Sequence, residues 1–468
     1  MTLPRALLAP ALLLLACGEA PPAEDQFMTT PLQPEAQRGG DPAAGYRALL
    51  NNGYVSCGIP YTAYAKVFAP VTARDKLPDH DQVRDGRNRT LPYYMNAFRT
   101  RAGVEVVAPN CLVCHSERIG DQIVVGLGNV SRDLTEDQSL QVSLAAALLR
   151  DPAEIAEAEK FAERMAAIGP YTLPRTIGVN AADNLAAVLF AHRDPTTLAW
   201  SSEPLLELPP EAPVPVDVPP WWRMANKAAM FYNGAGRGDH ARIMMTASTL
   251  CTDSVADAQA IDAYFNDVRA YIASLGPPRY PYPTDPAQVA AGQGVFAARC
   301  ARCHGSYGAG GSYPNLVIPL REVGTDTALA RDTAQFAGRF VDWFNRSFYG
   351  QAGHLQPLPG YVAPSLTGVW ATAPYLHNGS VPTLAALLES DRRPRYWTRD
   401  FAARDFDPQA VGYRTTALQS GQDAETDGNK RKRIYDTTLP GYGNGGHTFG
   451  DALTAEERAA VIEYLKTL

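Results

Sequence analysis

Two cysteines three positions apart, followed at once by a histidine, occur twice in this chain. The two copies are Cys111, Cys114 and His115, and Cys300, Cys303 and His304. In such a motif both thiols add to the vinyl groups of a haem, and the histidine ligates the iron from one face. The sequence therefore predicts two covalently bound haem c groups. A pair of redox-active or zinc-binding CxxC half-sites is the alternative, but it leaves both histidines unexplained.

Residues 1–17 have the character of a bacterial export signal. Arg5 supplies a positive charge, and residues 7–16 form a mostly apolar run. This run is too short to cross a bilayer as a helix. Residues 14–17 (Leu-Leu-Ala-Cys) resemble a lipobox, which predicts lipidation of Cys17, while an ordinary cleaved signal is the alternative.

The residue after Cys17 is Gly18 and not aspartate, so the resemblance to lipoproteins favours the outer membrane over the inner one. No later stretch of the sequence is long and apolar enough to cross a membrane. We therefore expect a protein of the bacterial cell envelope, on the periplasmic side, that contacts the membrane by its lipid anchor only.

The composition limits the size and the partners of the protein. The chain has 468 residues with 46% hydrophobic content, which is enough for two domains of ordinary size. A net charge of −7 gives no basic surface, so nucleic acid is not an expected partner. Thirty-eight prolines and 38 glycines indicate long irregular connections between the elements.

The seven cysteines divide by expected role. Four would attach haem and Cys17 would carry lipid, which leaves Cys57 and Cys251. In an oxidising, exported compartment two remaining thiols are expected to pair. We predict a Cys57–Cys251 disulfide, which requires their Cα atoms to come within bridging distance.

The first half of the chain is expected to hold a tether and one haem domain. Residues 18–43 are rich in Pro, Ala, Glu and Gln and predict a flexible tether. The N-terminal haem c domain would cover residues 44–276. Within it we expect helices over residues 142–168, 182–192 and 257–275.

The second half, residues 277–468, is expected to be a C-terminal cytochrome c domain. A helix over residues 286–298 leads into its CxxCH motif, and a helix beginning with a capping box of Thr454 and Glu457 closes the chain. This pair resembles the terminal helices of cytochrome c, and residues 268–275 repeat the pattern of the chain end. The predicted fold is mainly α, with two tandem cytochrome c-like domains and long irregular connections.

The second haem is expected to have two histidine ligands. No methionine follows Met245, so the partner of His304 would come from His354, His377 or His447. We favour His447, because the glycines before it let the backbone approach the haem closely. A loop histidine without this role is the alternative. His377 is the second choice as ligand, or a residue that binds near a haem propionate.

The second ligand of the first haem stays open between His80, His192, His240 and several methionines. One Gly-rich segment contains an aromatic ring, a cation, a carboxylate and an imidazole: Phe231, Arg237, Asp239 and His240. Such groups could move protons to bound oxygen and stabilise developing charge. A structural turn with a surface ion pair is the alternative. Trp221 and Trp222 are candidate electron relays between the haems, or simple packing residues.

Residues 370–384 (Trp-Ala-Thr-Ala-Pro-Tyr-Leu-His-Asn-Gly-Ser-Val-Pro-Thr-Leu) resemble a signature of the bacterial dihaem cytochrome c peroxidase superfamily. Within it the chain is most similar to the rubber oxygenase A-like dihaem proteins. The similar stretches are residues 53–60, 236–239, 445–447 and 463–468.

This resemblance implies a reactive N-terminal haem with an open or oxygen-holding face. It also implies a C-terminal haem with two histidine ligands, His304 and His447, that stores or relays electrons. The rubber-cleaving members are longer, and their catalytic aromatic residue has only Phe231 as a candidate here. Cleavage of polyisoprene is therefore not implied for this chain.

The leading hypothesis is an oxidoreductase in which peroxide or dioxygen reacts at the first haem. A small redox partner protein or another donor would supply the electrons. A pure electron-transfer cytochrome, with both irons six-coordinate, is the main alternative. Haem-supported binding without turnover is a third possibility.

Overall fold

The computed structural model describes residues 29–69, 75–137, 139–401 and 405–468, without the side chains of residues 332–337. The export signal, the lipidation site at Cys17 and the first part of the expected tether lie outside the described residues.

Helices make up about 40% of the structure, so the expectation of a mainly α fold is supported only in part. In the first half they are α1 (Pro42–Asn51), α2 (Tyr61–Val67), α4 (His80–Val83), α5 (Ser139–Ala146), α6 (Pro152–Ile168), α7 (Ala182–Ala191), α8 (His240–Met244) and α9 (Val255–Ser274). In the second half they are α10 (Pro286–Arg299), α11 (Ala301–His304), α12 (Leu320–Val323), α13 (Ala328–Arg346), α14 (Leu384–Leu388), α15 (Gly428–Arg431) and α16 (Ala455–Leu465).

The strands are short and form several small antiparallel sheets. The three-stranded sheets are β2 (Ile59–Pro60) with β4 (Glu105–Pro109) and β3 (Met95–Arg99), β1 (Thr30–Pro31) with β8 (Leu316–Pro319) and β10 (Gly360–Val362), and β14 (Thr416–Ala417) with β11 (Tyr396–Thr398) and β15 (Tyr435–Asp436). The two-stranded pairs are β5 (Ser116–Ile119) with β6 (Gln122–Val125), β7 (Gly236–Gly238) with β9 (Gly353–Leu355), and β12 (Phe406–Asp407) with β13 (Gly412–Tyr413). Among the described residues, no helix combines the length and the apolar character that a membrane span requires.

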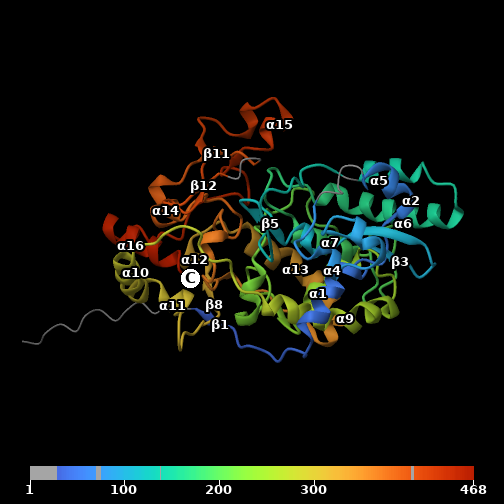
Figure 1. Ribbon diagram of the computed structural model, residues 1–468, viewed down its shortest axis with the longest axis horizontal. Coiled ribbons are helices and arrows are strands. Elements are labelled where there is room, and N and C mark those ends of the chain that lie inside the picture. Colours follow the sequence, from blue (N-terminus) through green and yellow to red (C-terminus); the bar gives the residue numbers. More distant parts are fainter. Residues whose placement is uncertain (1–28, 70–74, 138, 402–404) are drawn as a thin grey trace, which may run out of the picture.

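Each half of the chain contains a helix that crosses its closing helix at a glycine. A Cβ on Gly45 of α1 would lie 1.9 Å from the carbonyl oxygen of Asp267 in α9. A Cβ on Gly292 of α10 would lie 1.9 Å from the carbonyl oxygen of Ala460 in α16. The two crossings form separate contacts: α10 and α16 lie at the left-hand end of the molecule in Figure 1, and α1 and α9 lie right of its centre. This repetition agrees with the cytochrome c-like terminal helices expected from the sequence.

The sequence explains where these helices begin. An aspartate before a proline caps both α1 and α10: Asp41 accepts from the amides of residues 43 and 44, and Asp285 from those of residues 287 and 288. Proline suits the first helical position because its missing N–H has no partner there anyway. The predicted capping box of Thr454 and Glu457 is confirmed at the start of α16.

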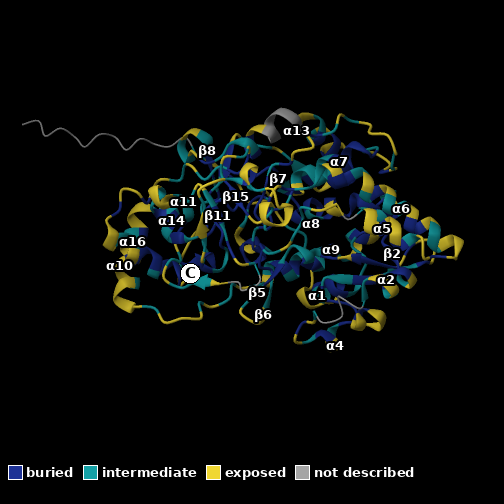
Figure 2. Ribbon diagram, turned by 90° about the horizontal axis from the view of Figure 1, so that it is seen from above, coloured by how far each residue is buried: buried dark blue, intermediate teal, exposed yellow. Residues whose placement is uncertain are grey.

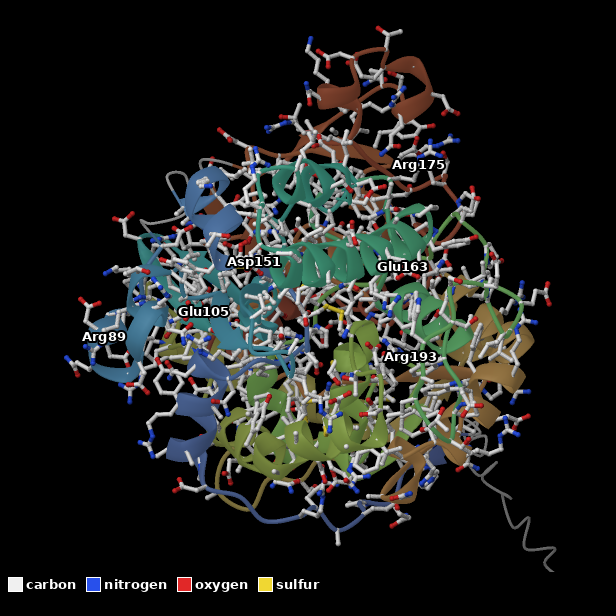
Figure 3. All side chains as sticks on the ribbon, turned by 90° about the vertical axis from the view of Figure 1, so that its right-hand side faces the viewer. Arg89, Glu105, Asp151, Glu163, Arg175 and Arg193 are labelled. Carbon is white, nitrogen blue, oxygen red and sulfur yellow. A yellow bond between two sulfur atoms is a disulfide. The ribbon has the colours of Figure 1, made fainter. Side chains whose placement is uncertain are left out.

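The expected helix over residues 142–168 is two helices, α5 and α6. Asp151 and Pro152 end the first and begin the second, because proline cannot continue a helix interior. Figure 3 labels Asp151 and Glu163 on α6, and Figure 2 shows many exposed residues on the outer sides of α5 and α6.

The expected division into two tandem domains is supported only in part, because α13 crosses it. Its residues Phe340, Trp343 and Phe344 are buried in the same core as α1 and α9. Trp343 stacks on Phe190 of α7 at 4.2 Å and donates to the carbonyl of Arg193. In Figure 1 this orange helix lies among elements of the first half. The Gly-Pro stop after α9 marks a helix end, but it does not determine which core a later helix joins.

The described end of the expected flexible tether is fixed in place. Strand β1 pairs with β8 of the second half. Arg38 forms ion pairs with Asp239 and Asp262 at 2.6 and 2.8 Å. For this part the prediction of flexibility is wrong, because distant partners, which composition does not reveal, hold the segment.

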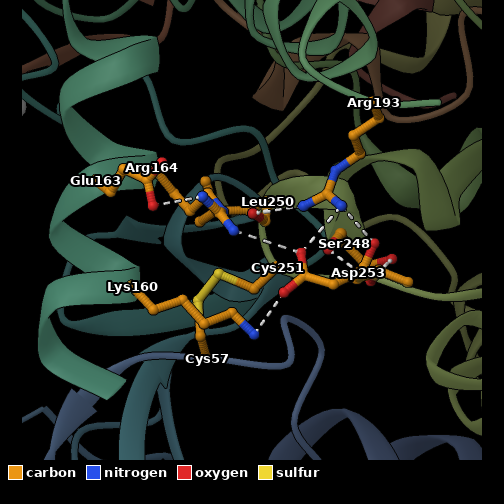
Figure 4. Close-up of a disulfide and its surroundings, with 10 residues drawn as sticks. Cys57, Lys160, Glu163, Arg164, Arg193, Ser248, Leu250, Cys251 and Asp253 are labelled. Atoms are coloured by element: carbon orange, nitrogen blue, oxygen red, sulfur yellow. Dashed lines mark hydrogen bonds and ion pairs between the residues drawn. A yellow bond between two sulfur atoms is a disulfide. The ribbon is translucent and has the colours of Figure 1, made fainter. Parts of the chain in front are cut away.

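Cys57 and Cys251 form a disulfide, with Cα atoms 5.6 Å apart (Figure 4). It joins the start of the first haem domain to the loop before α9, and such a bond typically contributes about 2–4 kcal/mol. Close to it, the carboxylate of Asp253 binds three cations: Lys160 at 2.6 Å, Arg193 at 3.1 Å and Arg164 at 3.8 Å. This part of the core is therefore held both covalently and by charge.

The α10–α16 crossing predicts that substituting two different glycines of α10 has opposite effects on stability. Gly292→Ala places a Cβ against a backbone carbonyl, so we expect the free energy of unfolding to fall by about 1–3 kcal/mol. Gly294, two residues on, is exposed and has nothing within 4 Å of its Cβ position. Gly294→Ala should leave stability unchanged or raise it by up to about 1 kcal/mol. Urea unfolding of both variants tests this, and equal effects would contradict the crossing.

Candidate functional site

The second CxxCH motif lies where α10 passes into α11. The short helix brings Cys300, Cys303 and His304 within one turn, and the His304 amide donates to the Cys300 carbonyl at 3.1 Å. Helix α10 is anchored by Phe296, which is buried against α16. The crossing of the terminal helices thus sets the position of both thiols and the imidazole.

The ring of His304 is oriented by a backbone carbonyl. Its Nδ1 lies 2.8 Å from the carbonyl oxygen of Pro364. A metal-ligating histidine commonly bonds through its second nitrogen in this way, which leaves Nε2 available to the metal. Burial lowers the pKa of His304 and so favours the neutral, ligating form.

His447 lies opposite His304, as the sequence analysis favoured. Their ring centres are 6.1 Å apart, with an angle of 57° between the rings. An imidazole–metal bond is about 2 Å long, so two imidazoles on opposite faces of one iron have ring centres roughly 6 Å apart. The separation therefore suits one iron between the two rings. Burial lowers the pKa of His447 to about 3, which keeps this ring neutral too.

The backbone at His447 is held close to that of residues 323–325. The His447 amide donates to the Val323 carbonyl at 2.6 Å, and a Cβ on Gly446 would lie 2.1 Å from the carbonyl carbon of Gly324. Arg393 donates to the carbonyls of Asn444, Gly446 and His447. Glycine at position 446, with φ +70°, is therefore required for this approach.

The first CxxCH motif lies between β4 and β5. Asn110 caps the single turn η2 (Cys111–Val113) by accepting from the amide of Leu112, and the His115 amide donates to the Cys111 carbonyl at 3.1 Å. Burial lowers the pKa of His115 to about 3. The Pro219 carbonyl approaches the His115 ring outside ordinary hydrogen-bond geometry, a weaker counterpart of the Pro364 contact.

No second imidazole is in ring contact with His115 among the described residues. His192 stacks on Trp200 and lies 2.9 Å through its Nδ1 from the Ser201 carbonyl, while His80 bonds to the carbonyl of Arg89. His240 is buried, and its Nε2 has no partner in the described part of the chain. The two motifs therefore differ, since only His304 faces another histidine.

The thiols do not resemble those of a redox-active CxxC pair. Reactive cysteines have a lowered pKa, whereas burial raises the pKa of Cys111 to about 12 and that of Cys300 to about 11. Within the described ranges, no group of three or more His, Cys, Asp or Glu side chains could hold a metal ion by itself. Both findings argue against the redox and zinc alternatives.

Two cations, Arg223 and Lys227, lie between the motifs in the sequence, and no sequence pattern marked either of them. Lys227 is part-buried, which lowers its pKa to about 8, and its charge acts on both His115 and His240. No hydrogen bond or ion pair joins its amine to the described residues. Arg223 is buried, and its charge acts on His304. Haem carries two propionate carboxylates, so the residues present fit this group, and Lys227 and Arg223 are suited to bind them.

Trp221 and Trp222 connect the two motifs within the turn η4 (Trp221–Asn226). The indole of Trp221 stacks on the His115 ring, with centres 4.9 Å apart. The indole of Trp222 donates to the carbonyl of Thr367 at 2.8 Å. A Cβ on Gly368 would lie 2.6 Å from this indole nitrogen, so only glycine permits the contact.

The four candidate residues of the first distal pocket lie in different surroundings. Asp239 binds Arg38 and caps α8, and Arg237 donates to the carbonyl of Gly234. Neither charge is unpartnered, as the structural-turn alternative anticipated. Phe231 is 40% exposed and lines an apolar cavity. A catalytic role for Phe231, Arg237, Asp239 or His240 stays a prediction.

His377 does not face His304. Its ring stacks on Tyr361 at 4.1 Å, and its Nε2 is buried without a partner among the described residues. The edge of Tyr232 lies nearby at 6.2 Å. The arrangement thus favours His447 over His377 as the residue opposite His304.

Comparisons with known proteins agree with a cytochrome. Residues 287–339, which include the second motif, match the family described as cytochrome C oxidase, cbb3-type, subunit III. Residues 360–398, which include Pro364 and His377, match the family described as RoxA-like, cytochrome c-like.

Two curated proteins of Sinorhizobium fredii are similar to the chain over longer stretches. The uncharacterized protein y4iM is 30% identical over 323 residues, which cover 61% of this chain and 71% of that protein. The chain belongs to the same family as y4iM. The uncharacterized protein y4iJ is 32% identical over 262 residues, or 42% of this chain and 41% of that protein. Together the matches support a family of c-type cytochromes related to RoxA, with covalently bound haem c and a redox or electron-transfer function.

The facing rings predict the effect of removing His447. In His447→Ala the haem attached at Cys300 and Cys303 should lose its low-spin, two-histidine signature in absorption and electron paramagnetic resonance spectra. The matched control is His354→Ala, which removes a part-exposed histidine on β9 and should leave the spectrum unchanged. A wild-type spectrum in His447→Ala would show that another residue supplies the ligand.

Proposed function

We propose that this chain is an exported dihaem c-type cytochrome oxidoreductase. Peroxide or dioxygen would react at the haem attached by Cys111 and Cys114, and the haem held by His304 and His447 would relay electrons. The observation that carries this proposal is the contrast between the two motifs. His304 faces a second imidazole at 6.1 Å, whereas His115 has no such partner among the described residues.

This contrast implies a different role for the haem at each CxxCH motif. Haem c supplies reversible iron redox chemistry, and an iron with two strong ligands carries electrons while an open one binds small molecules. The chain keeps its imidazoles neutral by burial and orients His304 through the Pro364 carbonyl. The carbonyls and amides around residues 323–325 and 444–447 then hold His447 in place.

The turn η4 supports electron transfer between the haems at the two CxxCH motifs. Trp221 packs on His115, and Trp222 bonds to Thr367 in the loop whose Pro364 carbonyl orients His304. The two indoles are adjacent in the chain, so a short, fully packed route joins the proximal ligands. Such a route is useful only if electrons pass from one site to the other.

The expected location belongs to the same proposal. The export signal and the lipobox-like cysteine Cys17 favour the periplasmic side of the bacterial cell envelope, with an outer-membrane lipid anchor. A small redox partner protein or another donor would deliver electrons there.

A pure electron carrier is the second candidate function. It is favoured by His240, which is buried with an unpartnered Nε2 and shares the nearby charge of Lys227 with His115. If His240 bound the first iron, both irons would be six-coordinate.

The haem count is the first test. Protein purified from a host competent in cytochrome maturation should contain two haems per chain that survive acid–acetone extraction, measured as the pyridine haemochrome. Replacing Cys111 and Cys114 with serine should remove one haem, and replacing Cys300 and Cys303 should remove the other. A single haem in the unaltered protein would contradict the proposal.

Coordination of the first iron separates the two functions. The ferric protein should show a high-spin component and bind about one cyanide per chain, because only one iron would have an open face. His240→Ala should leave cyanide binding intact. Two low-spin irons that ignore cyanide, together with a high-spin signal created by His240→Ala, would establish the carrier instead.

A further inference from the structure

An apolar cavity of about 140 Å³ lies between α7, α8 and α13. Two extended stretches, around residues 209–214 and 355–357, complete its wall. None of the residues of the two CxxCH motifs lines it. The wall includes Phe231, a candidate residue of the first haem's distal pocket, but otherwise consists of residues outside the site described above.

Aromatic rings form much of the cavity wall. Phe190 of α7, Phe340 and Phe344 of α13, and Phe231 of the turn before β7 all line it. The backbone of Phe231 has φ +66°, and its ring packs close to Gly236, where a Cβ would lie 3.1 Å away. The turn therefore holds an aromatic side chain at the cavity in a conformation that L-residues rarely adopt.

Asp183 is the only charged residue among the described residues that line the cavity. It lies in the first turn of α7, and no hydrogen bond or ion pair joins its carboxylate to the described residues. Asp183 is part-buried at the cavity, which raises its pKa to about 6, so the carboxylate is mostly ionised at neutral pH without a counter-charge among the described residues. A part-buried charge of this kind gains free energy when a group of opposite charge binds it.

The other polar side chains of the wall are neutral, and each has at least one partner. Asn184 donates to the Pro210 carbonyl at 2.9 Å, Asn233 accepts from the Ala235 amide at 3.1 Å, and Thr246 donates to the Ile243 carbonyl at 2.7 Å. The Asp183 carboxylate is therefore the only charged group among the described residues of the wall that could select a ligand. The cavity thus offers one anionic group in an aromatic, apolar enclosure.

We propose that this cavity binds a small organic cation, a protonated amine attached to an apolar body of about one ring. The ammonium would donate to Asp183, and the apolar body would lie among the phenylalanine rings. A charge-assisted hydrogen bond is stronger than a neutral one, and aromatic faces attract cations. A cavity of about 150 Å³ holds a molecule the size of benzene, so the volume suits a single ring.

Other ligand classes fit this cavity less well. An anion would be repelled by Asp183, and a neutral hydrocarbon would leave the part-buried carboxylate without a partner. A metal ion would find one carboxylate where it needs several ligands. The amine would be neither the oxidant nor the electron donor of the proposed function, so this inference goes beyond that function.

The test is calorimetric binding of two probes of nearly equal shape to the haem-loaded protein. 2-Phenylethylamine is a cation at neutral pH, and 2-phenylethanol is its neutral counterpart. The unaltered protein should bind the amine about tenfold or more tightly than the alcohol. This comparison needs no variant, and equal affinities or a preference for the alcohol would overturn the proposal.

Asp183→Asn keeps the shape of the side chain and removes its charge. We expect it to weaken amine binding about tenfold or more and to leave alcohol binding unchanged. Ala212→Trp, at an exposed position on the cavity rim, should weaken both probes. Unchanged amine affinity in Asp183→Asn would overturn the proposal. A Soret shift of equal size in both proteins would do so as well, because it would place the amine on an iron.

Discussion

The position of His304 relative to His447 determines what the second half of this protein can do. One iron ligated from both faces needs two imidazoles roughly 6 Å apart, and they come from segments more than a hundred residues apart in sequence. The α10–α16 crossing at Gly292 sets one side, and the close backbone approach at Gly446 sets the other. Both contacts are between backbones. The spacing of the two imidazoles therefore depends on positions where no side chain is tolerated.

Packing contacts also join the two halves of the molecule. Helix α13 belongs to the second half by sequence but completes the core around α1 and α9, and β7 pairs with β9 across the same boundary. The turn η4 then connects His115 to the loop behind His304. If two cytochrome-like units were joined only by a linker, the distance between His115 in one unit and His304 in the other would vary. Here the shared core makes that distance a fixed property of the fold.

Much of this arrangement could be predicted from local sequence. The CxxCH motifs, the helix that leads into Cys300 and the capping box at Thr454 are short-range patterns, and the structure contains each of them. Counting the remaining cysteines was enough to suggest the Cys57–Cys251 pair, because so few remained. The choice of His447 followed from the absence of later methionines and from the glycines beside it. Features that depend on residues close together in the sequence could therefore be predicted.

Interactions between residues far apart in the sequence could not be predicted in this way. The ion pair of Arg38 with Asp239 spans 201 residues, and nothing near either residue distinguishes it from a solvent-exposed charge. As a result, the sequence did not show that the Asp239 carboxylate is held in an ion pair, and it did not show that the segment around Arg38 is anchored. Lys227 was missed for the opposite reason, since a lone lysine after a tryptophan pair gives no sign that it is part-buried and that its charge acts on two imidazoles.

Three buried or part-buried charges differ in whether they have a partner within the protein. A charge with a partner has a structural role, whereas a charge without one can bind a ligand. The carboxylate of Asp239 already binds the guanidinium of Arg38 and accepts from the Arg242 amide at the start of α8. Lys227 and Asp183 lack such partners among the described residues, and burial shifts the pKa of each toward its neutral form. A protein retains an unpaired buried charge at a cost, unless another molecule supplies the opposite charge. For Lys227 that molecule is an acid, as a haem propionate is, and for Asp183 it is a base small enough to fit among phenylalanine rings.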